Sequence, residues 1–134
     1  MDEANGIERP NRLTMLGREL EFSGCNEVCQ GGPLACTFTI DGSLVEGRNA
    51  LGFRSRSLRF DPSPLEYAGS ILVPVRKSNL LIFGYALARI NPATCHVSVI
   101  SKVHEYMRLL RIDGQSVVFA TKAYGSQTAR IRLP

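Results

Sequence analysis

The sequence has few residues of the kinds that most often carry enzyme chemistry. It contains two histidines and four cysteines in 134 residues. None of the motifs G-x-S-x-G, H-E-x-x-H, G-x-G-x-x-G or the P-loop occurs. The carboxylates Asp41, Glu46, Asp61 and Glu66 are scattered along the chain, without an evident pair of acid and base. The sequence therefore favours a protein that is not an enzyme, and no catalytic residue is assigned.

A long apolar segment is also lacking. The longest apolar run, from Leu80 to Ala88, has nine residues, whereas a membrane-spanning helix needs about twenty. The first residues, MDEANG, carry negative charge and no apolar run, which is not the pattern of a secretory signal. These two observations predict a cytoplasmic protein without a membrane span.

The composition is that of a folded domain, with 44% hydrophobic and 21% charged residues. A chain of this length can bury a hydrophobic core of its own. Residues 1–12 are polar, contain three acidic residues and show no apolar periodicity, so they are interpreted as a flexible acidic N-terminal arm. Residues 13–134 are expected to form a single β-rich domain.

Two regions carry clear strand signals. Two β-prone runs flank Asp41-Gly42, a pair that suits the positive φ angles of a tight turn, and they predict a hairpin from Cys36 to Glu46. Residues 70–100 include only three charged residues and predict three successive strands. Because both faces of these strands are largely apolar, they need cover from a second layer, from a helix or from another copy of the chain.

Residues 12–22 fit two structures. A helix would place Leu13, Leu16 and Leu20 on one face, whereas a strand would run from Arg18 to Phe22. Gly17 weakens the helix by about 1 kcal/mol, and both alternatives stay open.

A helix is expected near residues 102–112. Val103, Tyr106, Met107 and Leu110 follow the spacing i, i+3, i+4 and i+7. A competing interpretation is a hairpin about Asp113-Gly114, and the helix is preferred because its residues are strong helix formers.

The last segments, QSVVFATKAY and TARIRL, predict a final hairpin in which Arg130 and Arg132 point outward and protect a sheet edge. The expected fold class is α+β. Its main part is antiparallel β, arranged as a small barrel or a sandwich-like sheet, with the one amphipathic helix near residues 102–112.

The cysteines suggest a metal site as one hypothesis. A zinc ion would be held by Cys25, Cys29 and Cys36, with Cys95 or His96 as the fourth ligand. The gaps of three and six residues between the first three cysteines differ from the usual two-residue knuckle.

Three alternatives to zinc remain for the cysteines. A disulfide would require an oxidising compartment. A reactive thiol would need a histidine nearby, whereas His96 and His104 are distant in sequence from Cys25 and Cys29. The remaining reading treats Cys36 and Cys95 as small buried residues and Cys25 and Cys29 as ordinary thiols of a loop.

An arginine-rich segment is the strongest functional signal. Thirteen of the sixteen basic residues are arginine, and residues 48–60 contain no acidic residue. Guanidinium groups contact phosphates, and aromatic rings stack on bases. This combination predicts a site for an anionic partner, with single-stranded nucleic acid as the natural ligand, at Arg48, Phe53, Arg54, Arg56, Arg59 and Phe60. The alternative is a solvated connection whose two phenylalanines anchor it to the core.

The preferred function is therefore a non-catalytic binding or assembly module that contacts an anionic partner, such as RNA, DNA or another protein. A zinc-stabilised or thiol-dependent protein is the first alternative. The second is a self-assembling structural or interaction domain, because the apolar block of residues 70–100 exceeds what one small sheet and a helix readily cover. A homo-oligomer is expected on the same ground.

Overall fold

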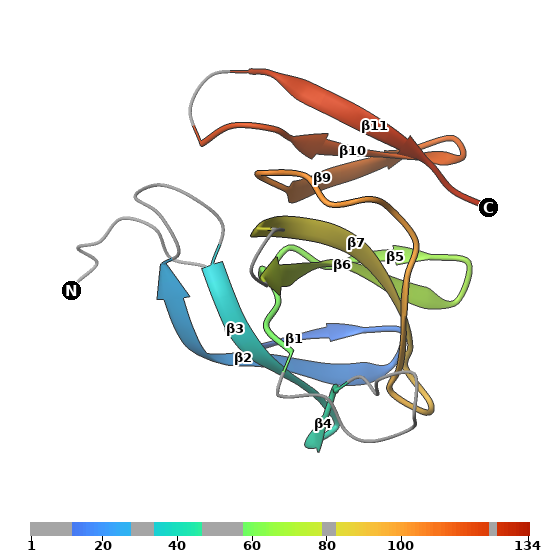
Figure 1. Cartoon of the computed structure of the whole chain (residues 1–134). Coiled ribbons are helices and arrows are strands. Elements are labelled where there is room, and N and C mark those ends of the chain that lie inside the picture. The colour runs from blue at the N-terminus through green and yellow to red at the C-terminus, as the bar shows by residue number, and fades with distance from the viewer. Residues whose placement is uncertain (1–11, 28–33, 47–57, 79–82, 124–125) are drawn as a thin grey trace, which may run out of the picture.

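The computed structural model describes residues 12–27, 34–46, 58–78, 83–123 and 126–134 (Figure 1). These residues form eleven strands in three antiparallel sheets. Each sheet is built from consecutive strands that pair in sequence order. Within these ranges, no helix has the length and apolarity to cross a membrane.

The three sheets follow one another along the chain. The first sheet contains β1 (Arg12–Met15), β2 (Arg18–Glu27), β3 (Leu34–Ile40) and β4 (Ser43–Leu44). The second contains β5 (Leu65–Tyr67), β6 (Ser70–Ser78), β7 (Phe83–Asn91) and β8 (His96–Val99). The third contains β9 (Arg108–Asp113), β10 (Ser116–Ala120) and β11 (Thr128–Arg132).

Tight turns with positive φ angles join the strands of the first sheet. Asp41 and Gly42, at φ 50° and 84°, turn β3 into β4, so the hairpin predicted there is confirmed. Leu16 and Gly17, at φ 56° and 71°, turn β1 into β2. Two successive positive φ angles match the right-handed twist of paired strands. Residues 12–22 are therefore a hairpin, and of the two open alternatives the strand is the one that forms.

The second sheet is the middle layer of the molecule. In Figure 1 it lies between the first sheet, in blue and cyan, and the third sheet, in orange and red. Ile71 and Val73 of β6 belong to the core shared with the first sheet, whereas Leu72 belongs to the core shared with the third. Successive side chains of a strand point to opposite faces. The three strands predicted in residues 70–100 are confirmed, and the first and third sheets cover both apolar faces of β6 and β7, whereas β8 is largely exposed.

A short extended stretch around Phe60 pairs with strands of both the first and the second sheet. Phe60 exchanges two backbone hydrogen bonds of 2.8 Å with Cys36 of β3 and bridges to Val75 of β6 on its other side. Its ring is fully buried and meets the ring of Phe38 edge to face, with 5.5 Å between centroids. Phe38 in turn stacks on Phe22 at 4.3 Å. Phe60 is thus a central residue of the core between the two sheets.

A second backbone pairing joins the second sheet to the segment that leads into β9. Tyr85 and His104 exchange two backbone hydrogen bonds of 2.7 Å. The neighbouring Gly84 has a φ of 152°, and a Cβ at this position would overlap the His104 carbonyl oxygen and touch Val103. Only a glycine permits this close approach of the two backbones.

The helix expected near residues 102–112 is wrong, and with it the α+β class. All helices and strands formed by the described residues are strands, and their three sheets are stacked without closing into a barrel. Arg108–Asp113 forms β9, which pairs with β10 in a hairpin whose two-residue turn is Gly114-Gln115. The hairpin about Asp113-Gly114, the competing interpretation of the sequence, is therefore the one that forms. The final hairpin of β10 and β11 is confirmed, with Arg130 and Arg132 exposed.

A β-bulge in β9 shifts the alternation of its side chains. Leu109 pairs with Phe119 and Arg111 pairs with Val118, so Leu110 is an extra residue on β9. Leu109 and Ile112 consequently face the same core, although three positions separate them. An insertion of this kind shifts the two-residue alternation of a strand to a spacing that a helix also shows. Leu110, expected to be buried on the helix, is 44% exposed.

Candidate functional site

The structure describes two of the six residues proposed for the arginine-rich segment. Arg48, Phe53, Arg54 and Arg56 lie outside the described residues. Arg59 donates a hydrogen bond from Nη1 to the Gly24 carbonyl at 3.1 Å, and this contact holds it against β2. Phe60 is enclosed in the core and offers no ring face to a ligand in this structure.

Two of the four cysteines form a disulfide. Cys25 of β2 and Cys36 of β3 are bonded, and their Cα atoms are 4.1 Å apart. The pairing of β2 with β3 shifts between Ser23 and Asn26, which places both Gly24 and Cys25 opposite Cys36. The bulge, the disulfide and the Arg59 contact therefore converge at one end of the first sheet.

The disulfide removes two thiolates from the proposed zinc site. Bonded sulfurs are not thiolates, and zinc binds the thiolate. Cys29 lies outside the described residues, Cys95 is a free thiol, and His96 is exposed at the start of β8. In the described part of the chain, no three His, Cys, Asp or Glu side chains gather where they could hold a metal ion. Of the four residues named for zinc that the structure describes, Cys25 and Cys36 are joined to each other by the disulfide.

A stable disulfide needs an oxidising compartment, whereas the cytoplasm predicted from the sequence keeps thiols reduced. The disulfide and the predicted location therefore disagree. Cys95, in contrast, is half-buried and packs beside the first core. Burial raises the pKa of its thiol, which lowers its reactivity at neutral pH.

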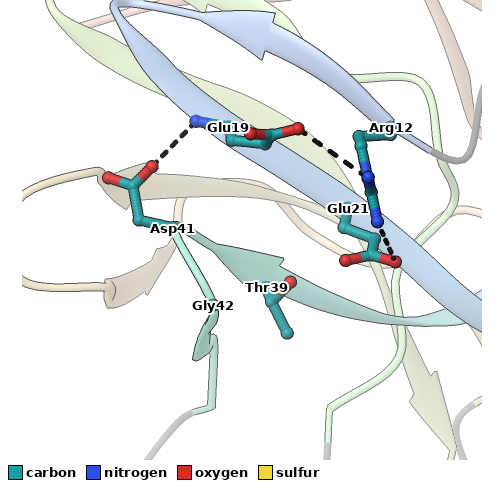
Figure 2. Close-up of a pocket in the computed structure, with 6 residues that line it drawn as sticks. All are labelled: Arg12, Glu19, Glu21, Thr39, Asp41 and Gly42. Atoms are coloured by element: carbon teal, nitrogen blue, oxygen red, sulfur yellow. Dashed lines mark hydrogen bonds and ion pairs between the residues drawn. The ribbon is translucent and has the colours of Figure 1, made fainter.

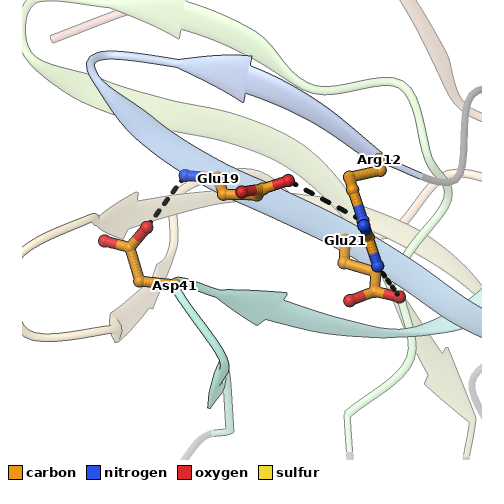
Figure 3. A network of polar contacts seen from close by, with 4 residues as sticks. All are labelled: Arg12, Glu19, Glu21 and Asp41. Atoms are coloured by element: carbon orange, nitrogen blue, oxygen red, sulfur yellow. Dashed lines mark hydrogen bonds and ion pairs between the residues drawn. The ribbon is translucent and has the colours of Figure 1, made fainter.

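A shallow hollow of about 450 Å³ lies on the outer face of the first sheet. Figure 2 shows the side chains that line it, which are Arg12, Glu19, Glu21, Thr39, Asp41 and Gly42. Two of its carboxylates share one cation, since Arg12 approaches Glu19 at 3.7 Å and Glu21 at 3.4 Å (Figure 3). Exposed pairs of this kind contribute little to stability.

The third carboxylate of the hollow holds the turn between β3 and β4. Asp41 accepts a hydrogen bond of 2.9 Å from the Glu19 backbone N–H and one of 3.1 Å from Arg18. The backbone hydrogen bond and the contact with Arg18 lower the pKa of Asp41. All three carboxylates are thus satisfied by neighbours, and the hollow is a structural feature of the first sheet.

The third sheet carries a set of arginines on its outer face. Arg111 of β9 and Arg130 of β11 are both the register partners of Val118 on β10. Directly opposed residues of paired strands point to the same side of the sheet. By the same register, four arginines and one carboxylate share this side, and we call them the arginine face: Arg108, Arg111, Arg130, Arg132 and Asp113.

The bulge at Leu110 creates this arrangement. In a regular strand, Arg108 and Arg111 would point to opposite faces because three positions separate them. The extra residue restores both to one side, opposite Ala120 and Val118 respectively. The other side of β9 and β10 packs on the second core, so the sheet has one apolar and one basic face.

The arginines differ in how firmly they are engaged. Arg130 lies 2.9 Å from Asp113, in an ion pair with both side chains more than half exposed. Arg132 makes a long contact of 3.5 Å with the Gln115 side chain. Arg108 is half-buried, with its guanidinium 5.8 Å from the centre of the Tyr106 ring. Arg111 is exposed. Arg111, Arg130 and Arg132 are therefore accessible to a partner.

The arginine face is predictable from the sequence only in part. The final hairpin predicted from the sequence placed Arg130 and Arg132 outward, but Arg108 and Arg111 fell within the helix expected near residues 102–112. The signal that could have united them is Asp113-Gly114, since a hairpin there continues into the final hairpin and aligns the three strands.

A comparison of the chain with protein-family models, curated proteins and solved structures finds no match.

Proposed function

We propose that this protein is a non-catalytic binding module that contacts an anionic partner through the arginine face. The observation that carries the proposal is the convergence of four arginines against one carboxylate on one side of a three-stranded sheet. Guanidinium groups suit carboxylates and phosphates because their planar fork donates two parallel hydrogen bonds. The neighbouring arginines would meet several charges of one extended ligand.

Edge protection is the simpler role for charges on a sheet. It accounts for Arg130 and Arg132, which lie on β11 at the end of the sheet order. Arg111 lies on β9, which is the other end strand of the same sheet, so a place on an end strand does not by itself separate binding from edge protection. What supports binding is that Arg111, Arg130 and Arg132 share one side of the sheet and are exposed there, because edge protection does not require the charges to share a side.

The segment of residues 48–60 remains a proposed contact for the same partner. Arg59 is the only arginine of that segment within the described residues, and it is held against Gly24. The arginine face and this segment can be separated by mutation, because they share no residue.

Binding of fluorescent polyglutamate and of an oligothymidylate, followed across a series of salt concentrations, tests the proposal. One variant carries Arg111→Ala, Arg130→Ala and Arg132→Ala. A matched control loses as many charges elsewhere, at Arg12, Lys77 and Lys102, and a third variant carries Arg54→Ala and Arg56→Ala.

We expect at least one polyanion to bind with an affinity that falls as salt rises. Loss of the three arginines should weaken binding by about tenfold or more, while the matched control keeps the wild-type affinity. If neither polyanion binds, or if both charge-reduced variants lose affinity equally, the arginine face is not a binding site. Loss in the Arg54 and Arg56 variant alone would move the site to the segment of residues 48–60.

A further inference from the structure

The free edge of β11 adds a second recognition element to the arginine face. In the sheet order β11-β10-β9, and within the described part of the chain, β11 has a neighbour on one side only. Its residues alternate between exposed positions, at Thr128, Arg130 and Arg132, and half-buried positions, at Ala129 and Ile131. An unpaired edge of this kind is a template for a further strand.

The hydrogen-bond phase of the hairpin determines which backbone groups point outward. Leu133 donates its N–H to the Gln115 carbonyl at 2.7 Å, and Thr121 donates to the Gln127 carbonyl at 3.2 Å. In an antiparallel pair, every second residue bonds to the partner strand. The backbone groups of residues 129 and 131 therefore face β10, and those of Thr128, Arg130 and Arg132 face away from the sheet.

The side chains next to this edge have two opposite characters. Arg130 and Arg132 stand on the arginine face, whereas Ala129 and Ile131 pack against the second core. A strand added to the edge would place alternate residues beside the arginines and the others beside the apolar layer.

We infer that the partner is an extended acidic peptide that adds to β11 as a fourth strand of the third sheet, with acidic and apolar residues in alternation. This inference rests on the proposed function, since it assigns the partner of the arginine face. The acidic residues pair with Arg130 and Arg132, the apolar ones extend the layer of Ala129 and Ile131, and the backbone bonds to the outward groups of β11.

Charge selects this occupant over the alternatives. A second copy that paired β11 with β11 would set Arg130 and Arg132 against arginines, and like charges directly opposed destabilise a sheet. Single-stranded nucleic acid commonly relies on aromatic stacking, but the residues that the register places on this face include no aromatic ring. The phosphates alone would use the arginines and leave the backbone edge unused.

The test uses a synthetic peptide of alternating Glu and Val residues as probe. A block peptide of the same composition keeps its charge but loses the alternation. A third peptide carries N-methyl groups on the backbone nitrogens of one edge, and a fourth carries them on the other edge. The full chain is compared with its Thr128→Pro variant, which removes one outward N–H and leaves the arginines and the pairing with β10 in place. Thr128→Ala is the matched control.

We expect the alternating peptide to bind more tightly than the block peptide. N-methylation of one edge only, and Thr128→Pro, should each weaken binding by about fivefold, whereas Thr128→Ala should not. Thermal unfolding of both variants confirms that the fold is kept.

Equal binding of all four peptides, or equal affinity in both Thr128 variants, would overturn strand addition and leave only a charged surface, so the proposed function would survive. Binding of the oligothymidylate but not of the alternating peptide would also overturn it. If no anionic probe binds, the proposed function itself fails.

Discussion

Arg111 and Arg130 flank Val118 from its two neighbouring strands and point to the same side of the third sheet. The pairing depends on Leu110, the extra residue that shifts the alternation of β9. Val118 itself is 1% exposed, whereas Arg111 and Arg130 beside it are exposed. The two arginines and the exposed Leu110 thus follow from one local irregularity of the backbone.

The matched substitutions Leu109→Ala and Leu110→Ala distinguish the bulged strand from a helix. Leu109 is 5% exposed and lies in the second core, whereas Leu110 is 44% exposed. Truncation of Leu109 should cost about 2–5 kcal/mol of unfolding free energy, and truncation of Leu110 less than about 0.5 kcal/mol. Urea titration measures both. The reverse order would favour the helix, because its spacing buries Leu110 with Tyr106 and Met107.

The strands were predictable where local chemistry and tertiary packing agree. Asp41-Gly42 supplies the positive φ angles of its turn, and the apolar block around Val73 and Leu87 is buried on both sides. The helix prediction failed because the helical spacing of Val103, Tyr106, Met107 and Leu110 spans two structures, the segment that leads into β9 and the bulged strand on which Leu110 is exposed. Periodicity alone does not separate these two structures.

The candidate site was less predictable because it is made by register. Arg111 and Arg130 are nineteen positions apart in the sequence, and only the pairing of three strands brings them beside Val118. The disulfide also depends on strand register, because a shift in the pairing of β2 with β3 at Gly24 places Cys25 opposite Cys36. The expected cytoplasmic location disfavours this bond, whereas the register of β2 and β3 brings the two cysteines together.

Reduction of the Cys25–Cys36 bond should destabilise the protein. The bond closes a loop with a sequence separation of 11, and a loop of that size contributes about 2–3 kcal/mol. Urea titration with and without reductant measures the difference, and the double variant Cys25→Ala with Cys36→Ala should not respond to reductant. Peptide mapping of unreduced protein should recover the two cysteines as a linked pair. Alkylation of Cys36 in unreduced protein would contradict the pairing.

The carboxyl group of Asp41 should add an acid-dependent contribution to stability. The Glu19 backbone N–H and the Arg18 side chain hold the pKa of Asp41 below its ordinary value of 3.8 in the folded state. The folded state thus favours the ionised form, and the stabilisation is present above that pH and is lost as pH falls through the folded pKa.

The variant Asp41→Asn tests this contribution because asparagine tolerates the positive φ but does not titrate. The stability advantage of the wild type over this variant should shrink as the pH falls from neutral to below about 4. Urea midpoints over that range measure it, with Glu66→Gln as a control for the loss of one exposed carboxylate. An advantage that does not change with pH would contradict the account.

The most direct test of the central claim is an amide chemical-shift map of the labelled protein during titration with the alternating Glu and Val peptide. The account predicts that the largest shifts fall on Thr128, Arg130 and Arg132 of β11 and on Arg111 of β9, with the first sheet unaffected. Shifts confined to the outer face of the first sheet, or an unchanged spectrum at saturating peptide, would contradict it.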